Sequence, residues 1–574
     1  MGLTEVKITA LGSEGQGIGV LPSGKTCFVS GVFPGEVCLC ELENETSKYA
    51  VLNAVELLSE SPDRISPFRP ADEVCGGLPL AALSYEAQLK FKETRVRDCL
   101  TRIGGLGDEV LDEVFKPIIG ADDPFRYRNH MQYAIRDGKA GLLCAKSDKL
   151  GDYDGKLIEY EIFGLIKDVS CDCFDRAPTR LFDGLVLRGS QRTKQVLVEF
   201  VSSIDAPHEV TIRDAERYFE TTKLFDNICN TCEENGYVLN GFLFRISPNK
   251  ASRRTRTGVR TVYSGADNYD EIFCERTFRI KAGSFFQVNT EQAEKLANKA
   301  SEACSGAKVI YDLYCGCGTL GLAVKQKGQK LLGIEVVPEA IASAKINRSL
   351  ALDGQEAEEC EFICKDVLKA DFAQLIKSGK IPAPDCIIVD PPRKGLDIGV
   401  VKKVMELNAP KICYISCDPA TLARDLKMLT REYKIEEVTP IDLFPNASHV
   451  ETVVHLCRNG AVHHMKLDPE PYEMIKSGEK TIELRLYDEK RQKIRPGDEI
   501  IFTNNATGET IRTQVIKLHC FSSFEKLYRT LPLLKCGYTK DDISLARPSD
   551  MEQYYSADDQ ARYGVVGIEL LLQK

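Results

Sequence analysis

A glycine-rich turn between a strand and a helix, near the middle of the chain, constrains the fold more than any other feature. The apolar run 308–313 leads into the segment YCGCGTLG at 314–321, and the next apolar run, 330–335, ends in an acid 19 residues after Gly316. Glycine lets the backbone approach a bound nucleotide, and an acid at the end of the second strand can accept both ribose hydroxyls. This order predicts a doubly wound unit that binds its ligand at the carboxyl ends of its strands.

The sequence around this turn divides into four regions. Strand and helix patterns alternate from about residue 281 to 460, which indicates a parallel sheet with crossover helices. The N-terminal region has four short β-rich runs broken by glycine, at 6–8, 15–20, 26–29 and 36–42, as in a small barrel. A new β-rich pattern opens at Met465. Between these, a helix is predicted over 83–103 and strands over 185–188 and 195–200. We therefore predict four domains: 1–60, 61–280, 281–460 and 463–574.

The predicted fold class is a multidomain α/β protein. It begins with an OB-like β-barrel, continues with a mixed α+β domain and a Rossmann-like domain, and ends with a small β-barrel domain. No run is long and apolar enough to span a membrane, and residues 1–10 carry charges where a signal peptide has an apolar core. We expect no membrane partner and a cytoplasmic location, in which the 22 cysteines stay reduced.

The net charge of −10 argues against a general affinity for nucleic acid, because phosphate binding depends on Lys and Arg. Charge is local, however, and residues 249–260 form a basic stretch that can line an RNA groove or lie as a solvated loop. Arg126-Tyr127-Arg128-Asn129 pairs cations with an aromatic ring, which fits an RNA contact and equally an exposed structural turn.

Two alternatives arise at the glycine-rich turn. Gly316, Gly318 and Gly321 also fit the spacing of a dinucleotide site, so an NAD oxidoreductase stays open on this segment alone. Cys315 and Cys317 resemble metal ligands, but two cysteines one residue apart in such a turn are more often small loop residues. We expect no metal site there.

The groups with reactive chemistry follow downstream. One apolar run ends in Asp390-Pro391-Pro392-Arg393, and another ends in Ser416-Cys417-Asp418-Pro419. Glu451 follows Cys417 by 34 residues, with His449 beside it as a competing base. A thiol and a carboxylate are the two groups needed to add to a pyrimidine ring and then remove a proton from it.

These segments, in this order and together with SFFQVN at 284–289, resemble the RNA uracil-5 methyltransferase family, whose members act on 23S rRNA or tRNA. The resemblance covers roughly residues 1–458. It implies a Rossmann-like domain that uses S-adenosylmethionine and an RNA substrate, with 23S rRNA favoured and tRNA as the alternative. It also implies that Cys417 is the nucleophile and Glu451 the base, and that four residues contact S-adenosylmethionine: Gln287, Tyr314, Glu335 and Asp390.

The terminal regions resemble two further families. The N-terminal segments GQGIG and VFPGE resemble the TRAM domain, an OB-like RNA-binding barrel. The last region resembles the ASCH domain, whose signature places Lys480, Glu483 and Arg485 near one cleft. This second resemblance implies binding of nucleic acid or a nucleoside, with hydrolysis of a modified nucleoside as the lesser option.

One feature departs from the uracil-5 methyltransferase pattern. Many members hold an iron–sulfur cluster on Cys-x5-Cys-x2-Cys and a distant fourth cysteine. Here Cys75 matches the second position, whereas Arg69 and Leu78 occupy the first and third. Cys171 or Cys173 can supply the fourth. Because a cubane cluster usually needs four thiolates, we expect no cluster to bind.

Two other function classes explain less of the sequence. A non-catalytic RNA-binding protein has no need of the Cys417 and Glu451 pair. An NAD oxidoreductase leaves the Asp-Pro-Pro-Arg and Ser-Cys-Asp-Pro segments without a role. The sequence therefore favours a methyltransferase that acts on C5 of a uridine.

Overall fold

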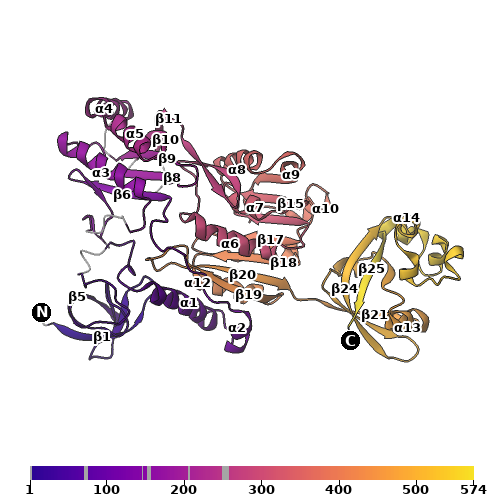
Figure 1. The fold of residues 1–574 in the computed structure, drawn as a ribbon. Helices are drawn as coiled ribbons and strands as arrows, with labels where there is room; N and C mark the ends of the chain where they lie inside the picture. The colour runs from indigo at the N-terminus through magenta and orange to yellow at the C-terminus, as the bar shows by residue number, and fades with distance from the viewer. Residues whose placement is uncertain are drawn as a thin grey trace. The chain divides into compact units, whose positions relative to one another are not determined.

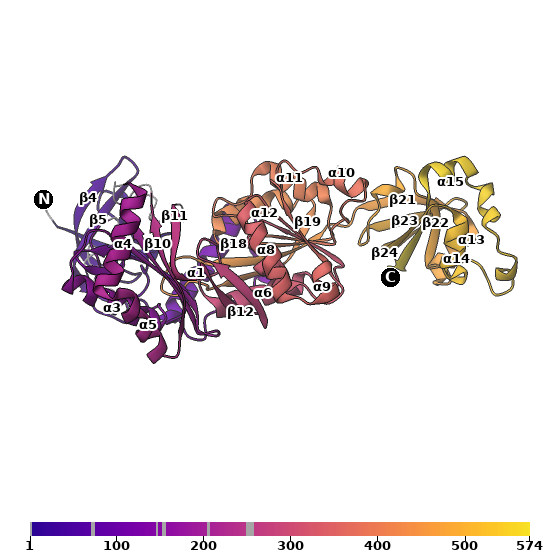
Figure 2. The ribbon, with the colours of Figure 1, turned by 90° about the horizontal axis from the view of Figure 1, so that it is seen from above.

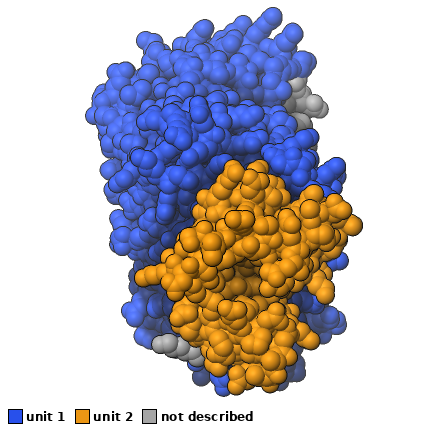
Figure 3. Space-filling model, turned by 90° about the vertical axis from the view of Figure 1, so that its right-hand side faces the viewer, with its two compact units in different colours: residues 1–431, 435–456 blue, residues 432–434, 457–574 orange. Residues whose placement is uncertain are grey.

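The computed structural model describes residues 3–69, 75–144, 147–151, 157–203, 207–247 and 258–573 (Figure 1). The chain forms two compact units, coloured separately in Figure 3: residues 1–431 with 435–456, and residues 432–434 with 457–574. The finer division of the first unit into three domains stays a prediction. Of the basic stretch 249–260, all but the last three residues lie outside the described part of the chain.

The N-terminal strands close into a barrel in the order β1-β2-β3-β5-β4. Their bounds are β1 (Thr4–Leu11), β2 (Gly17–Val20), β3 (Thr26–Val29), β4 (Val37–Glu45) and β5 (Tyr49–Ser59). Gly19 lets two strands approach closely, since a Cβ there would lie 2.5 Å from Cγ1 of Val6. Arg64 then ties the barrel to the next segment through a buried ion pair with Glu36, at 2.6 Å. The predicted barrel is thus confirmed, with β5 as an additional strand.

The central region contains a long helix and a six-stranded sheet among its described residues. The helix α1 (Tyr85–Arg102) starts at Ser84, whose side chain accepts a hydrogen bond from the backbone N–H of Ala87, and α2 (Asp108–Val114) follows. The sheet has the order β11-β10-β9-β8-β6-β7. Its strands are β6 (His130–Arg136), β7 (Lys139–Gly141), β8 (Gly184–Ser190), β9 (Gln195–Ser202), β10 (Val238–Ile246) and β11 (Val259–Gly265).

Aromatic side chains fill the core of this region. The Phe182 and Phe219 rings stack with their centroids 5.4 Å apart, and Phe200 and Phe242 lie against them. Such rings bury large apolar areas, which fixes the helices on the sheet. The helices of this region are α3 (Glu161–Arg176), α4 (His208–Thr222) and α5 (Leu224–Glu234).

The hairpin β12 (Asn268–Phe273) and β13 (Arg276–Lys281) precedes a seven-stranded sheet of order β16-β15-β14-β17-β18-β20-β19. The pairs β14–β15, β15–β16, β14–β17 and β17–β18 are parallel, as the alternating pattern predicts. The strands are β14 (Val309–Leu313), β15 (Lys330–Glu335), β16 (Cys360–Cys364), β17 (Cys386–Val389), β18 (Lys411–Ser416), β19 (Tyr433–Ile441) and β20 (Glu451–Arg458).

Helices cover both faces of this sheet (Figure 2). These helices are α6 (Thr290–Ala303), α7 (Thr319–Val324), α8 (Pro338–Ala351), α10 (Phe372–Lys377), α11 (Ile398–Leu407) and α12 (Pro419–Leu429), with the short α9 (Gly354–Glu358) before β16. On one face of the sheet α7 contacts both α6 and α8, and on the other face α11 contacts both α10 and α12. A doubly wound sheet of this kind opens its ligand site at the carboxyl ends of its parallel strands.

The C-terminal unit is β-rich, with a five-stranded sheet of order β21-β23-β24-β25-β22. Its strands are β21 (Val462–Leu467), β22 (Ile482–Leu486), β23 (Glu499–Asn504), β24 (Thr510–Phe521) and β25 (Val565–Leu572). Its α-helices are α13 (Pro469–Ser477), α14 (Phe524–Thr530) and α15 (Ala557–Tyr563). Throughout the described residues of both units, every helix is too short or too polar to cross a lipid bilayer.

Candidate active site

The carboxyl edge of the seven-stranded sheet gathers four of the residues that the sequence analysis singled out. Tyr314 follows β14, Glu335 ends β15, Asp390 follows β17 and Cys417 follows β18. Because these strands run parallel and β14 pairs with both β15 and β17, their ends meet at one edge. Glu451 opens β20, the neighbour of β18, and its charge acts on Cys417, so it lies near the same edge.

The glycine-rich turn has the backbone conformation that its sequence demands. Gly316 and Gly318 have φ angles of 53° and 77°, which glycine adopts without steric cost. Tyr314 also lies in the left-handed region, with φ of 68°, and a non-glycine residue there stores strain of the kind found at functional sites. The Gly316 N–H donates to Oε2 of Glu335 at 3.3 Å. A Cβ built on Gly316 would meet no atom within 4 Å, so the turn is open at this point.

Gln287 lies on a segment that packs against this turn. The Sγ of Cys317 donates to the carbonyl oxygen of Phe285 at 3.4 Å, which explains a cysteine in the turn without a metal. The amide of Asn129 donates to the carbonyl oxygen of Gln287 at 2.8 Å. The segment is therefore held at Phe285 and at Gln287, and the Gln287 side chain is half-buried.

Cys417 occupies a tight turn between β18 and α12. The hydroxyl of Ser416 accepts from the Asp418 N–H and donates to the Asp418 carbonyl oxygen. The Asp418 carboxylate caps α12 by accepting from the N–H groups of Ala420 and Thr421, and Pro419 is the first residue of the helix. Cys417 is therefore held, half-buried, one residue before the cap of a helix, where the helix dipole favours a thiolate.

Burial dominates the electrostatics of the site. It raises the pKa of the Asp390 carboxyl to about 7, and burial together with the charge of Asp390 raises the pKa of Glu451 to about 8. Asp312, beneath the glycine-rich turn, has its pKa raised to about 8 by burial and by Asp390. The pKa of the Cys417 thiol rises to about 12, through burial and then the charges of Glu451 and Asp390. This edge of the sheet thus gathers desolvated acids, which favour a cation among them.

Arg393 brings a positive charge to this cluster of acids and contacts His449. Nη2 of Arg393 lies 3.1 Å from Nε2 of His449, and since a guanidinium only donates, Nε2 is the acceptor. Burial, and then the charge of Arg393, lowers the pKa of His449 to about 4. His449 is therefore neutral with its Nε2 lone pair already engaged, which favours Glu451 as the proton acceptor. The charge of Arg393 also opposes the rise in the pKa of both Cys417 and Glu451.

The segment Arg126-Tyr127-Arg128-Asn129 is largely structural. The Tyr127 hydroxyl is buried and donates to the carbonyl oxygen of Pro445 at 2.9 Å, and the Asn129 amide also donates to the Thr290 hydroxyl. Arg126 is exposed, with a left-handed φ of 47°. Of the four residues, Arg126 retains the exposure that an RNA contact requires.

Cys75 lies in a setting that the sequence did not predict. It pairs with Cys144 in an isolated antiparallel bridge, and both side chains are buried. The Sγ atoms of Cys171 and Cys173 accept hydrogen bonds from the Ala140 N–H and the Asn227 amide. Within the described ranges no group of three or more Cys, His, Asp or Glu is placed to hold a metal. The absence of an iron–sulfur cluster stays a prediction.

The three signature residues of the C-terminal unit meet as the sequence predicts. Glu483 is buried and pairs with Nζ of Lys480 and Nε of Arg485, each at 2.8 Å. They line a cavity of about 350 Å³ together with Tyr554 and Tyr555. Charged and aromatic groups in one cleft suit a nucleoside or RNA ligand, and that role of the cleft stays a prediction.

Sequence reasoning missed a set of polar residues on α1. Gln88 and Lys92 are almost wholly buried, and Arg95 is half-buried. All three hydrogen-bond the loop 442–448, which leads to Glu451. Their spacing of four and then three residues was a signal, because it places them on one helical face. A polar stripe is usually read as solvated, however, and the apolar pattern of α1 is weak.

Comparison with known proteins agrees with this geometry. Residues 273–459 match the tRNA (Uracil-5-)-methyltransferase family, residues 4–51 the TRAM domain and residues 465–573 the ASCH domain. An uncharacterized RNA methyltransferase of Clostridium tetani is 32% identical to this chain, over 78% of this chain and 94% of the relative's length. One of Bacillus cereus is 32% identical over 79% of this chain and 96% of its own length.

A solved structure extends the similarity to the fold. The tRNA (uracil-54, C5)-methyltransferase of Pyrococcus abyssi, in complex with S-adenosyl-L-homocysteine, is 25% identical and superposes with a TM-score of 0.60. The match covers 79% of this chain and 99% of that one. With the glycine-rich turn, the buried acids and the cysteine turn at one sheet edge, these similarities show that the chain belongs to the S-adenosylmethionine-dependent RNA uracil-5 methyltransferase family.

Proposed function

We propose that this enzyme methylates C5 of a uridine in RNA through a covalent bond between Cys417 and C6, with Glu451 as the base. The observation that carries the proposal is the meeting of a held cysteine and a buried carboxylate beside Asp390. The charge of Glu451 is the second largest influence on the pKa of Cys417, after burial, so the two groups are electrostatic neighbours. A nucleophile and a base placed together are what the reaction requires.

The proposed steps balance in atoms and charge. The Cys417 thiolate adds to C6 of uracil, and the electron pair moves to the enolate formed by C5, C4 and O4. S-adenosylmethionine supplies an electrophilic methyl group, which the enolate carbon C5 takes. Glu451 then removes the proton from C5, the C6–S bond breaks, and the thiolate of Cys417 is regenerated. The net products are 5-methyluridine, S-adenosylhomocysteine and one proton.

The residues around the cofactor site have matching roles. Tyr314, the glycine-rich turn and Glu335 line the nucleoside end, where the Glu335 carboxylate already accepts from Gly316 and suits ribose hydroxyls. Asp390 and Gln287 complete the set that we propose contacts S-adenosylmethionine. The positive sulfonium offsets the desolvated carboxylates, and it also lowers the cost of forming a thiolate at Cys417. The nucleophile is therefore activated most when the methyl donor is bound.

For the RNA, we favour 23S rRNA over tRNA on the family resemblance, although the P. abyssi relative acts on uracil-54 of a tRNA by its name. In either RNA the uridine must be unpaired or flipped, because a duplex hides C5 and C6 from a pocket at the sheet edge. The TRAM-like barrel, which matches over residues 4–51, is a second proposed contact for the RNA.

The buried acids predict that S-adenosylmethionine binds more tightly as pH rises. Ionised Asp390 and Glu451 attract the sulfonium, and this attraction is lost as each is protonated. The increase should continue through about pH 7 and 8 and be complete near about pH 9, because the pKa values of these acids in the free enzyme are about 7 and about 8. S-adenosylhomocysteine, whose sulfur is neutral, should show a much smaller slope. Calorimetric titration of both ligands measures this, and equal slopes would contradict it.

Replacement of the nucleophile should stop the reaction before C5 loses its proton. Cys417→Ala is expected to release no tritium above background from RNA labelled at uracil C5, with S-adenosylmethionine binding retained. Cys364→Ala, at the exposed cysteine that ends β16, is the matched control and should release tritium at the parent rate. Release by Cys417→Ala at the parent rate would contradict the mechanism.

The same assay identifies the RNA substrate. With labelled 23S rRNA and labelled tRNA in parallel, we expect the parent enzyme to release tritium from 23S rRNA.

Removal of the base should trap the enzyme on its RNA. Glu451→Gln keeps the shape of the side chain but cannot accept the C5 proton, so a methylated covalent adduct should form and resolve at least about a hundredfold more slowly. Denaturing gel electrophoresis with labelled RNA measures this adduct, and tritium release measures its resolution. Adduct turnover at the parent rate would show that another group is the base, with His449→Gln as the variant to compare.

A further inference from the structure

We propose that three residues of α1, Gln88, Lys92 and Arg95, are positioning residues that hold the loop 442–448 and thereby set the place of Glu451. This inference rests on the proposed role of Glu451 as the base. The loop connects the end of β19 to the start of β20, and Glu451 follows Ser448 by three residues. The three α1 residues share one face of the helix, because they are spaced by four and then three positions.

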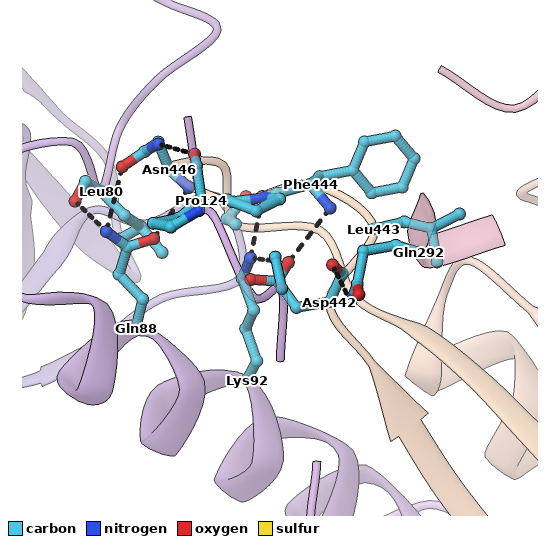
Figure 4. Close-up of polar contacts among 12 residues, drawn as sticks. Leu80, Gln88, Lys92, Pro124, Gln292, Asp442, Leu443, Phe444 and Asn446 are labelled. Atoms are coloured by element: carbon cyan, nitrogen blue, oxygen red, sulfur yellow. Dashed lines mark hydrogen bonds and ion pairs between the residues drawn. The ribbon is translucent and has the colours of Figure 1, made fainter. Parts of the chain in front are cut away.

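Gln88 holds the middle of the loop. Its Oε1 accepts from the backbone N–H of Asn446 at 2.8 Å, and its Nε2 donates to Oδ1 of the same residue at 3.2 Å (Figure 4). Asn446 needs such a hold because its φ of 69° lies in the left-handed region. Its amide also donates to the carbonyl oxygen of Pro124. The strained residue at the centre of the loop is therefore fixed on its backbone and on its side chain.

Lys92 holds the start of the loop. Its Nζ pairs with Oδ1 of Asp442 at 2.6 Å and donates to the carbonyl oxygen of Phe444 at 2.9 Å (Figure 4). The side chains of Lys92 and Asp442 are both 0% exposed. The same Oδ1 accepts from the Phe444 N–H at 3.1 Å, so the carboxylate links the ammonium to the loop backbone.

Arg95 holds the end of the loop nearest to the base. Its Nη1 donates to the carbonyl oxygen of Ser448 at 2.9 Å. Ser448 is buried, and the two residues after it are His449 and Val450. Gln292 supports the loop from the opposite side by donating to the carbonyl oxygen of Asp442 at 2.9 Å.

A wholly buried charged pair is costly, because desolvation offsets most of the attraction, and an apolar pair of similar volume often stabilises a fold as well. The hydrogen bonds of the pair are directional, so they favour one backbone conformation of the loop, which apolar contacts cannot do. The rate of proton removal depends on that conformation, because a base must lie within hydrogen-bonding reach of the proton that it takes. We therefore infer a role in the last chemical step, in addition to one in stability.

The test compares adduct formation with proton release in the full-length enzyme. Arg95→Met should form the methylated Cys417–RNA adduct near the parent rate, with an unchanged KM for RNA. Its adduct should resolve, and release tritium, at least about tenfold more slowly because Glu451 is displaced. Lys90→Met, an exposed position on the same helix, removes the same charge and should match the parent in both steps. The double variant Lys92→Met with Asp442→Asn should resemble Arg95→Met without leaving a buried charge unpaired.

The outcomes separate this inference from the proposed mechanism. Thermal unfolding and S-adenosylmethionine binding establish that each variant is folded, and Arg95→Met alone decides the test if the double variant is not. Equal slowing of adduct formation and proton release, or no slowing of either, would overturn the positioning role. Rapid adduct turnover by Glu451→Gln in the same experiment would instead overturn the assignment of the base.

Discussion

The structure depends on the parallel pairing of β14, β17 and β18. This pairing brings the ends of three strands to one edge, so Tyr314, Asp390 and Cys417 meet although they are far apart in the sequence. Local sequence produces this arrangement, because each apolar strand is followed by a turn that glycine, proline or a helix-capping residue defines. The chemistry of the site follows from where those strands end, and the helices on both faces of the sheet keep the strands in register.

Desolvation is the second constraint. Asp312, Asp390 and Glu451 have raised pKa values because burial disfavours their charge, and Cys417 shares this environment. A cluster of desolvated carboxylates attracts a cation such as a sulfonium. In the proposed mechanism, the positive charge of the methyl donor lowers the cost of ionising the Cys417 thiol, whose pKa is high. The proposal therefore links cofactor binding to activation of the nucleophile.

Much of the fold and the candidate site could be predicted from the sequence. The strand 330–335 has the predicted bounds, and Cys417 lies in the predicted turn at the end of a strand, because local composition dictates both. The fifth barrel strand was missed, since residues 49–59 alternate with many exposed positions. The contacts of Lys92 with Asp442 and of Cys75 with Cys144 join residues distant in sequence, and no local pattern encodes them. The burial of Glu451 was likewise invisible, because it depends on the neighbouring strand.

The central claim is that Cys417 bonds to C6 of the target uridine and that the C5 proton must leave before the bond breaks. RNA containing 5-fluorouridine at the target tests this directly, because fluorine cannot leave as a proton does. The account predicts that the parent enzyme with S-adenosylmethionine stalls on this RNA, and that mass spectrometry of the digested complex finds a methylated fluorouridine on the peptide containing Cys417. Absence of an adduct, or an adduct on another cysteine, would contradict the account.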